Sequence, residues 1–275
     1  MAITAQDVNK LRQTTGAGMM DCKNALVEAN GDFEVAIDIL RKKGQKVANK
    51  RADRDTAEGA VIAKTNENGT KGVVVMLNCE TDFVAKNDEY VSFTNAIADA
   101  ALNNQVNTTE ELLNQTINGL PISEKINEMV GKIGEKIQIG AFEVIEAAQV
   151  FSYIHPGNRL ASLIGISKNS PSFEEMGKNL TMQIAAMAPI SINENDINPE
   201  ILQKEKEIAM DLARNEGKAE NMLEKIAMGR VNKFVKESSL VNQEYIKDGK
   251  LTVAQYIASI DKDINVTALK RVIVG

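Results

Sequence analysis

The spacing of apolar residues divides the chain into a helical first part, a middle part rich in strands and a second helical part. Up to Gly44, apolar positions recur every three or four residues in three runs, which is typical of amphipathic helices. Thr4, followed by Asp7 three residues later, has the pattern of a helix start. We therefore predict that residues 1–55 form a three-helix module plus a charge-rich, partly helical linker, with the third helix ending near Gly44.

The middle of the chain changes to a period of two. Residues 60–65 and 71–78 flank an Asn-Gly turn, which predicts a β-hairpin. Helices are predicted after it over residues 84–103, 109–115 and 123–134. Further strands are predicted over residues 136–146, 149–154 and 159–167, and a helix over residues 173–187. Antiparallel strands followed by a helix thus occur twice, which favours an α+β fold with two related core subdomains, residues 56–134 and 135–188.

The second helical part reads as a helical hairpin over residues 189–238. Ile201, Ile208 and Leu212 share one face of its first helix, and a turn near Gly217 leads into a returning helix. Two isolated antiparallel helices bury one face each, so the hairpin should project and could serve a dimer or partner contact. Residues 239–275 are expected to run through an exposed loop and a short helix to a strand that returns to a sheet.

A short stretch, residues 77–87, covers the junction between the second hairpin strand and the helix predicted after it. Thr81 and Asp82 are good N-cap residues for that helix. Phe83 then has two interpretations: a hydrophobic staple that packs at the start of the helix, or an exposed wedge that enters a partner protein. The local pattern alone favours the staple.

Two adjacent methionines, Met19 and Met20, follow a glycine-rich break in the first module. Neighbouring residues on a helix diverge by about 100°, so both side chains cannot face the same small core. We expect at least one of them to be exposed, and the alternative is a methionine that fills a gap in that core.

Composition narrows the possible functions. A net charge of −6 and a pI near 5.1 argue against direct nucleic-acid binding. The chain has no signal-peptide pattern at its start and no apolar run long enough for a membrane span. Its two cysteines, Cys22 and Cys79, predict no disulfide framework, and with one histidine they predict no metal site. We expect a soluble cytoplasmic protein without a cofactor.

No catalytic constellation stands out. The chain has no phosphate-binding glycine motif and no nucleophile motif of a hydrolase. A pairing of Cys79 with His155, the sole histidine, is the one arrangement that spacing leaves open, and it would make the protein a thiol-dependent enzyme. We expect instead a protein without catalytic residues of its own.

Two motifs resemble a known family. Residues 15–23, with residues 28–32 behind them, resemble the N-terminal module of the bacterial elongation factor Ts family, and residues 78–86 resemble the core signature of that family. Residues 132–136 and 153–155 fit later segments in the same order. Gly140 and Ala141 depart from the family pattern, because many members carry basic residues there, and this departure puts a role for those charges in doubt.

The resemblance implies a guanine-nucleotide exchange factor for the GTPase elongation factor Tu, with a ubiquitin-associated-like N-terminal module. It implies that Thr81, Asp82, Phe83 and Val84 insert near the nucleotide site of the GTPase and displace its magnesium ion. Arg12, Met19 and Met20 would contact the GTPase, and His155 would lie near the contact to a different domain of it. Residues 189–238 match the coiled-coil protrusion of the family. The alternative, based on the three-helix module alone, is a helical adaptor that binds ubiquitin-like proteins without exchange activity.

Overall fold

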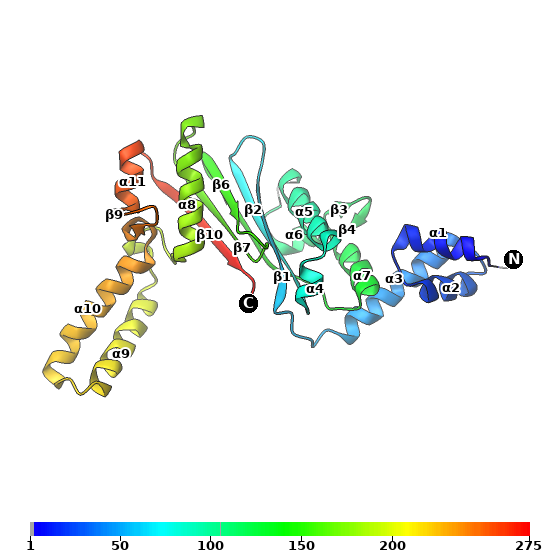
Figure 1. Cartoon of the computed structure of the whole chain (residues 1–275), viewed down its shortest axis with the longest axis horizontal. Coiled ribbons are helices and arrows are strands. Elements are labelled where there is room, and N and C mark those ends of the chain that lie inside the picture. The colour runs from blue at the N-terminus through cyan, green and yellow to red at the C-terminus, as the bar shows by residue number, and fades with distance from the viewer. Residues whose placement is uncertain (1–2, 105) are drawn as a thin grey trace.

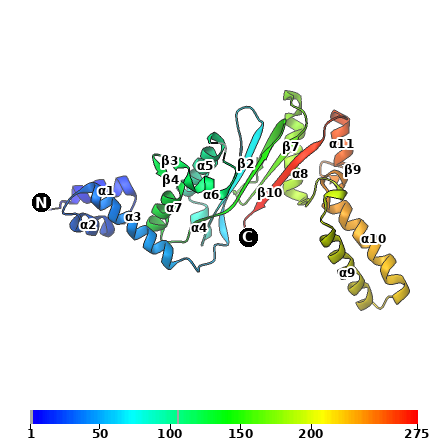
Figure 2. The ribbon, with the colours of Figure 1, turned by 180° about the vertical axis from the view of Figure 1, so that it is seen from behind.

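A computed structural model describes residues 3–104 and 106–275 as an elongated molecule. The N-terminal helices lie at one end, a centre of strands and helices follows, and a helical hairpin lies at the other end (Figures 1 and 2). This confirms the predicted α+β class with an N-terminal three-helix module and a protruding hairpin.

The N-terminal module consists of α1 (Ala5–Thr15), α2 (Met19–Glu28) and α3 (Phe33–Lys50). Thr4 and Asp7 form the expected capping box at the start of α1. The predicted end of the third helix near Gly44 is wrong, since α3 continues to Lys50. It does so because Val47 and Ala48 pack against the core of the central part. The partly helical character expected of the linker is thus confirmed for residues 45–50.

The first sheet has the order β1-β2-β5, with all neighbours antiparallel. The predicted hairpin is confirmed as β1 (Glu58–Thr65) and β2 (Lys71–Cys79). Strand β5 (Gln138–Glu146) pairs with β2 and so belongs to the first sheet. Our placement of this strand in the second β/α unit is therefore wrong. Pairing with β2 buries its apolar positions on the first core, and this long-range choice has no local signal. The other borders of the predicted segments stay predictions.

The second sheet has the order β10-β7-β6 and is also antiparallel. It contains β6 (Gln149–Ile154), β7 (Leu160–Ile166) and β10 (Val266–Ile273). The predicted return of the last strand to a sheet is therefore confirmed.

The two sheets pack against each other, and helices cover their outer faces. Val61, Val74 and Leu163 lie in the core between the sheets, whereas Ile62 and Val73 face the helices on the outside of the first sheet. This alternation explains why β1 and β2 read as nearly continuous apolar runs: both of their faces are buried.

Several helices cover the outer face of the first sheet. They are α4 (Asp82–Ala85), α5 (Asp88–Asn103), α6 (Thr109–Asn114) and α7 (Ile122–Ile133), with a small β3 (Thr116–Ile117) and β4 (Leu120–Pro121) hairpin between the last two. The single helix predicted from about Val84 to Asn103 is wrong, because the Asn87 side chain accepts hydrogen bonds from the N–H groups of Glu89 and Tyr90 and starts a new helix. The second sheet is covered by α8 (Glu174–Met187).

The hairpin is formed by α9 (Pro199–Asn215) and α10 (Glu220–Ser238), followed by β8 (Glu244–Tyr245), β9 (Asp248–Thr252) and α11 (Val253–Ile260). Three alanines and one leucine are buried in the hairpin: Ala209 and Ala213 in α9, and Leu223 and Ala227 in α10. The face that we expected to be apolar and packed is exposed instead, including Ile208 and Leu212. Alanines allow the helices to approach more closely than larger side chains would, and this displaces the larger residues outward.

Candidate functional site

The candidate site is built around residues 79–87, which connect β2 to α5; we call this segment the 79–87 loop. Its single helical turn, α4, buries Ala85 and packs Val84 partly against the first core. Phe83 points the other way and is 84% exposed. The staple interpretation of Phe83 is therefore wrong, since a staple would bury the ring at the start of the helix.

Glu135 holds the base of this loop. Its Oε2 accepts hydrogen bonds from the backbone N–H groups of Glu80 (3.1 Å) and Thr81 (3.0 Å), and its Oε1 accepts one from the Thr81 hydroxyl (2.6 Å). One carboxylate thus satisfies three donors that the turn leaves without partners within the loop. Thr81 stands at the N-cap position of α4, as predicted, although its side chain makes no capping bond, whereas Asp82 is the first residue of the helix and not its N-cap.

Glu80 fixes the same base from the other side. Its carboxylate accepts hydrogen bonds from Arg51 at the end of α3 (2.8 and 2.9 Å) and from the backbone N–H of Lys136 (2.6 Å). The bond from the Lys136 backbone, and then the bond from Arg51, lower the pKa of Glu80 below its ordinary value. The loop is therefore tied to two segments distant in the sequence.

Asp82 and Lys86 form a further local contact. The Lys86 ammonium donates to the Asp82 carboxylate at 2.7 Å, and this bond lowers the pKa of Asp82. Asp82 is the first residue of α4, where a negative charge is favourable. Phe83 is thus held outward beside an ionised carboxylate.

A buried floor lies beneath the loop. The Tyr90 hydroxyl donates to the carbonyl of Leu77 at 2.7 Å, and burial raises the pKa of this phenol. Cys79 is fully buried, its thiol donates to the carbonyl of Thr81 at 3.2 Å, and burial raises the pKa of the thiol to about 11. A thiol with this pKa is almost entirely protonated at neutral pH and is a poor nucleophile.

His155 lies elsewhere. It is exposed after β6, and its Nδ1 shares a hydrogen bond of 2.9 Å with the Tyr153 hydroxyl. The bonds of Cys79 and His155 are thus made with other groups, and the arrangement gives no support to a thiol–imidazole pair.

Met19 and Met20 begin α2 and are exposed by 57% and 62%. The interpretation of a methionine that fills a gap in the module core is therefore wrong. Arg12, near the end of α1, is also exposed. The sulfur-containing side chains offer an adaptable apolar surface next to this cation.

A groove of about 500 Å³ brings the two predicted contact regions together. It is lined by Arg12 and Met19 from the module and by Phe83 and Val84 from the 79–87 loop. Met20 and His155 do not line it. The floor of the groove comes from α5 and α7, and it includes Tyr90, Met129, Lys132 and Ile133.

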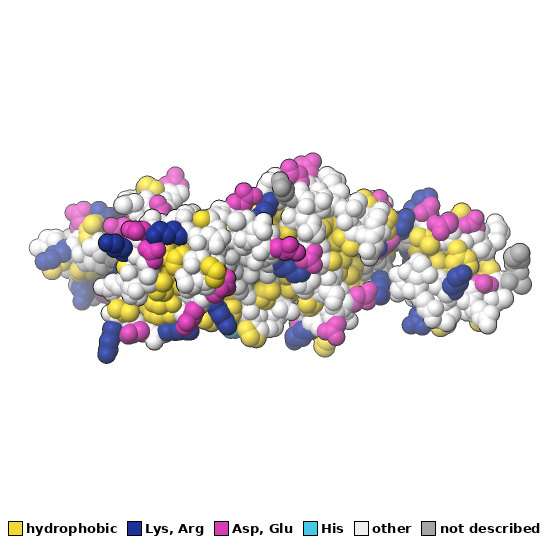
Figure 3. Space-filling view, turned by 90° about the horizontal axis from the view of Figure 1, so that it is seen from above, with side chains coloured by type: hydrophobic (Ala, Val, Ile, Leu, Met, Phe, Trp, Pro, Cys, Tyr) yellow, Lys and Arg dark blue, Asp and Glu magenta, His cyan; other side chains and the backbone are white. Residues whose placement is uncertain are grey.

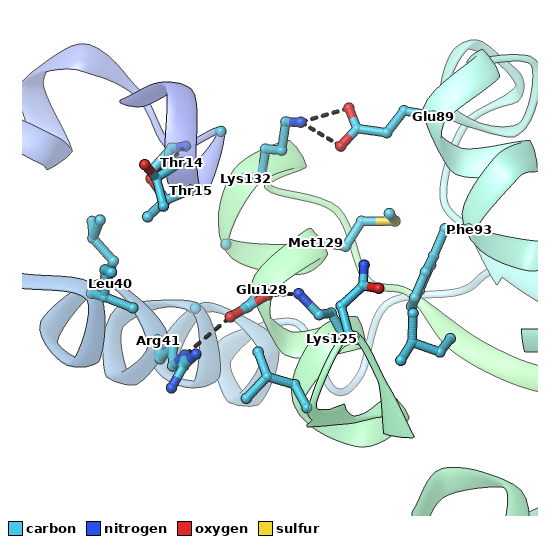
Figure 4. Close-up of a pocket in the computed structure, with 18 of the residues that line it drawn as sticks. Thr14, Thr15, Leu40, Arg41, Glu89, Phe93, Lys125, Glu128, Met129 and Lys132 are labelled. Atoms are coloured by element: carbon cyan, nitrogen blue, oxygen red, sulfur yellow. Dashed lines mark hydrogen bonds and ion pairs between the residues drawn. The ribbon is translucent and has the colours of Figure 1, made fainter. Parts of the chain in front are cut away.

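A second hollow of about 630 Å³ lies between the module and the core (Figure 4). In Figure 4, Thr14 and Thr15 of α1 and Leu40 of α3 lie on one side of it, and Phe93 of α5 lies on the other. The charged side chains that line it bond to one another: Glu128 accepts from both Arg41 and Lys125, Lys132 donates to Glu89, and Lys43 donates to Asp21. Among the described residues, the hollow therefore offers no free charge to recognise a ligand.

The surface seen from above carries acidic and basic side chains interspersed along the whole molecule, without a large field of one sign (Figure 3). Among residues 3–104 and 106–275, no group of three or more His, Cys, Asp or Glu side chains is arranged to hold a metal ion. None of the described helices is both long and apolar enough to cross a membrane.

The residues that anchor the loop were not identified from the sequence. Glu135 lies 54 residues from Thr81 and Arg51 lies 29 residues from Glu80, and no periodicity links these positions. Residues 132–136 matched a family segment, which was the available signal that this stretch is constrained, but it gave no partner for Glu135. Gly140, where the chain departs from the family pattern, lies at a register shift between β2 and β5.

Comparisons with known proteins agree over most or all of the chain. Residues 80–275 match the family described as Elongation factor TS. Elongation factor Ts of Christiangramia forsetii is 54% identical over 273 residues, covering 99% of each chain. The proteins of the same name from Flavobacterium psychrophilum (52% over 273 residues, 99% of each chain) and Amoebophilus asiaticus (50% over 276 residues, 100% of each chain) are similar to a comparable degree.

Proposed function

The chain belongs to the elongation factor Ts family, and on this premise we propose that it is a guanine-nucleotide exchange factor for the GTPase elongation factor Tu. In this proposal it binds the GTPase with GDP, weakens the binding of GDP and magnesium, and lets GTP replace GDP. It acts in the cytoplasm as part of translation, and it uses no cofactor and no catalytic residue of its own.

The observation that carries the proposal is the exposed ring of Phe83 on a loop whose base is fixed. Phe83 is 84% exposed. At the base of the same loop, Glu80 is bonded to Arg51 and Lys136, and Thr81 is bonded to Glu135. A large exposed apolar side chain on a rigid support loses little conformational entropy on binding. Such a support suits insertion into a partner better than a flexible loop would.

The proposed mechanism follows from reciprocal coupling. A GTPase holds GDP through its phosphates, a lysine and a bridging magnesium ion. An exchange factor that binds the nucleotide-free form more tightly must weaken nucleotide binding by the same factor. We propose that residues 81–84 insert near the nucleotide site, where Phe83 supplies apolar contact and Asp82 supplies negative charge close to the magnesium site.

The energetics require more than one contact. Each tenfold acceleration of GDP release needs about 1.4 kcal/mol, and burial of one phenylalanine side chain supplies roughly 1.5–3 kcal/mol. Phe83 therefore accounts for one or two powers of ten. We assign further contacts to Arg12, Met19 and Met20, and a separate one to His155.

The test is release of a fluorescent GDP analogue from elongation factor Tu, measured with and without this protein. We expect equimolar protein to accelerate release by at least tenfold, with a further increase as the concentration of the protein rises. An unchanged release rate at equimolar protein would show that the proposal is wrong.

A Cys79→Ser variant in the same assay addresses the thiol-dependent alternative. The raised pKa of the thiol and its bond to the Thr81 carbonyl indicate a structural role. We expect exchange within about twofold of the wild type, since serine can donate the same bond. The adaptor alternative predicts no effect on GDP release by any variant.

A further inference from the structure

The groove shared by Met19 and Phe83 exists because the N-terminal module is held at one angle to the core. The two residues lie on separate elements, α2 and the 79–87 loop, and α3 leads from the module into the centre of the molecule (Figures 1 and 2). The angle between module and core therefore determines whether both residues can reach one partner at the same time.

The crossing of α3 and α7 is the first feature that sets this angle. At the crossing, Gly44 faces Gly131, and a Cβ atom placed on Gly131 would lie 2.8 Å from the Cα of Gly44. A Cβ atom placed on Gly44 would lie 2.6 Å from the carbonyl oxygen of Asn127. The two backbones are thus in direct contact, and any side chain at either glycine must push the helices apart.

Lys132, the residue after Gly131, is the second feature. Its ammonium donates to both oxygens of Glu89 (2.6 and 2.5 Å), and Glu89 lies at the start of α5, two residues after the 79–87 loop ends. The stem of Lys132 passes next to Gly16, where a Cβ atom would come within 2.8 Å of it. Gly16 ends α1 in the left-handed conformation, three residues before Met19. Lys132 therefore contacts Gly16 in the module and Glu89 in the core, and Figure 4 shows its bond to Glu89.

The hollow behind Lys132 shows why such a device is needed. A hollow of about 630 Å³ lies beside the crossing and is lined by residues of α1 and α3 on one side and of α5 and α7 on the other, so the module is closely packed at the crossing and not across the hollow. Resistance to tilting comes instead from the glycine crossing, from Lys132 and from the ion pair between Arg41 of α3 and Glu128 of α7 (3.0 Å, Figure 4).

We infer that Gly44, Gly131 and Lys132 are positioning residues that hold the Met19 surface and Phe83 at the spacing required for simultaneous contact with the GTPase. This inference rests on the proposed function. Two contacts held at a matching distance act with a high effective concentration, and a change of the angle removes that advantage without removing either contact. Gly44 and Gly131 lie outside the lining of the groove and act through the module, whereas Lys132 also lines the groove floor.

The test begins with Gly131→Ala in the GDP-release assay. We expect release at limiting concentrations of the protein to slow by roughly five- to tenfold, as one of two linked contacts is lost. Gly229→Ala is the matched control, because Gly229 is also inside a helix but nothing lies within 4 Å of an added Cβ atom. We expect Gly229→Ala to accelerate GDP release from the GTPase as much as the wild type does.

A double-mutant cycle separates positioning from a general loss of structure. If Gly131 acts through the module contact, Gly131→Ala has no further effect once Met19→Ala and Met20→Ala have removed that contact. Its effect should also be reduced in the Phe83→Ala background, because the spacing matters only while both contacts are present. An undiminished effect in the methionine background would overturn the inference.

A distance measurement gives a readout that does not depend on exchange. Spin labels at Glu28→Cys in the module and Glu110→Cys on α6 occupy exposed positions on either side of the crossing. We expect Gly131→Ala to shift or broaden the distance distribution and Gly229→Ala to leave it unchanged. An unchanged distribution in a folded Gly131→Ala protein would contradict the inference.

Lys132→Gln provides a second variant in case Gly131→Ala does not fold. It removes the ion pair with Glu89 and should broaden the same distances and slow exchange by about twofold, in keeping with a partly exposed pair. Lys64→Gln is its control, since Lys64 forms a partly exposed ion pair with Asp99 at 2.7 Å and both residues belong to the central part of the molecule, away from the module. Equal effects of the two lysine variants would contradict the inference.

The two proposals fail in different ways. If the wild type did not accelerate GDP release from the GTPase, the proposed function would be refuted, while the distance measurement would still test the positioning role.

Discussion

The 79–87 loop and the α9–α10 hairpin both present apolar side chains to solvent, but they are supported in different ways. The loop exposes one large ring, Phe83, and its base is bonded to Arg51, Glu135 and Lys136 from other parts of the chain. The hairpin exposes a row of medium-sized side chains that includes Ile208 and Leu212.

The ion pairs of the hairpin join residues of the hairpin itself, such as Lys206 with Glu224 and Arg230 with Glu216. The hairpin joins the rest of the molecule at its base. There the Gln243 side-chain amide donates to the carbonyl of Met187, at the end of α8, and to the carbonyl of Glu237, near the end of α10. The difference indicates two uses of exposed apolar surface. A ring fixed from several sides is suited to precise insertion, whereas a self-contained pair of helices can be changed or removed without affecting the rest.

Phe83→Ala tests the loop side of this comparison and should have the largest effect. We expect GDP release to slow by roughly ten- to a hundredfold, since the burial of one phenylalanine side chain supplies about 1.5–3 kcal/mol. The thermal unfolding midpoint should stay unchanged, because the ring makes little contact with the folded protein. Ile208→Ala on the hairpin is the control and should leave the release rate within about twofold. A midpoint lowered by many degrees in Phe83→Ala would restore the staple interpretation.

Glu135→Ala tests whether the support of the loop matters as much as the ring. It leaves the N–H groups of Glu80 and Thr81 without their acceptor, which should cost about 1–3 kcal/mol of stability. We expect exchange to slow by about tenfold, as a mobile loop loses entropy on insertion. Glu135→Gln, which keeps one acceptor oxygen, should fall between this variant and the wild type in both urea unfolding and GDP release. Normal exchange in Glu135→Ala would show that rigidity of the loop is not required.

Glu80→Gln sharpens the same point through pH. Because the pKa of Glu80 is lowered in the folded protein from its ordinary value of 4.5, ionised Glu80 stabilises the fold above that pH. This stabilisation is lost as the pH falls through the lowered pKa. We expect Glu80→Gln to be less stable than the wild type by about 1 kcal/mol at pH 7, with the difference shrinking as the pH falls below the ordinary pKa of 4.5 and through the lowered pKa. A difference that stayed constant as the pH fell would assign the loss to the shape of the side chain.

Removal of residues 195–238 tests the hairpin side and should have the smallest effect on exchange. We expect a folded core with cooperative unfolding, and GDP release slowed by less than about threefold, which is less than 1 kcal/mol. Size-exclusion chromatography of the wild type and the shortened protein would show in the same experiment whether the hairpin forms a dimer. Loss of all soluble protein would show that the hairpin is part of the core.

Much of the fold could be predicted from local patterns. The positions of α1, β1, β2 and β6 follow from a capping box, from short apolar runs and from the turn between β1 and β2, and these are short-range signals. The pairing of β5 with β2 was predicted wrongly, because sheet partners are chosen by burial across long distances in the sequence. The extent of α3 was missed for the same reason: its last turns are held by packing against the core and not by their own propensity.

For the candidate site, the sequence pointed to the exposed residues but not to the residues that support them. The family resemblance, confirmed by the comparisons, pointed to Phe83 and Met19, although the local pattern around Phe83 favoured burial. The prediction could not include Glu135 as the support of the loop or Gly44 and Gly131 as the crossing point, because each role depends on a partner more than 50 residues away. Such roles become visible only when both partners are placed in space.

The pairing of β10 with β7 has a consequence for synthesis of the protein on the ribosome. Ile273 pairs with Leu160, so the second sheet lacks one of its three strands until more than a hundred further residues have been translated. During that interval β7 has an open edge of unpaired backbone groups and apolar side chains, which is prone to intermolecular association. The first sheet is complete once β5 has emerged, so nascent chains should acquire a protease-resistant half well before the other half can form.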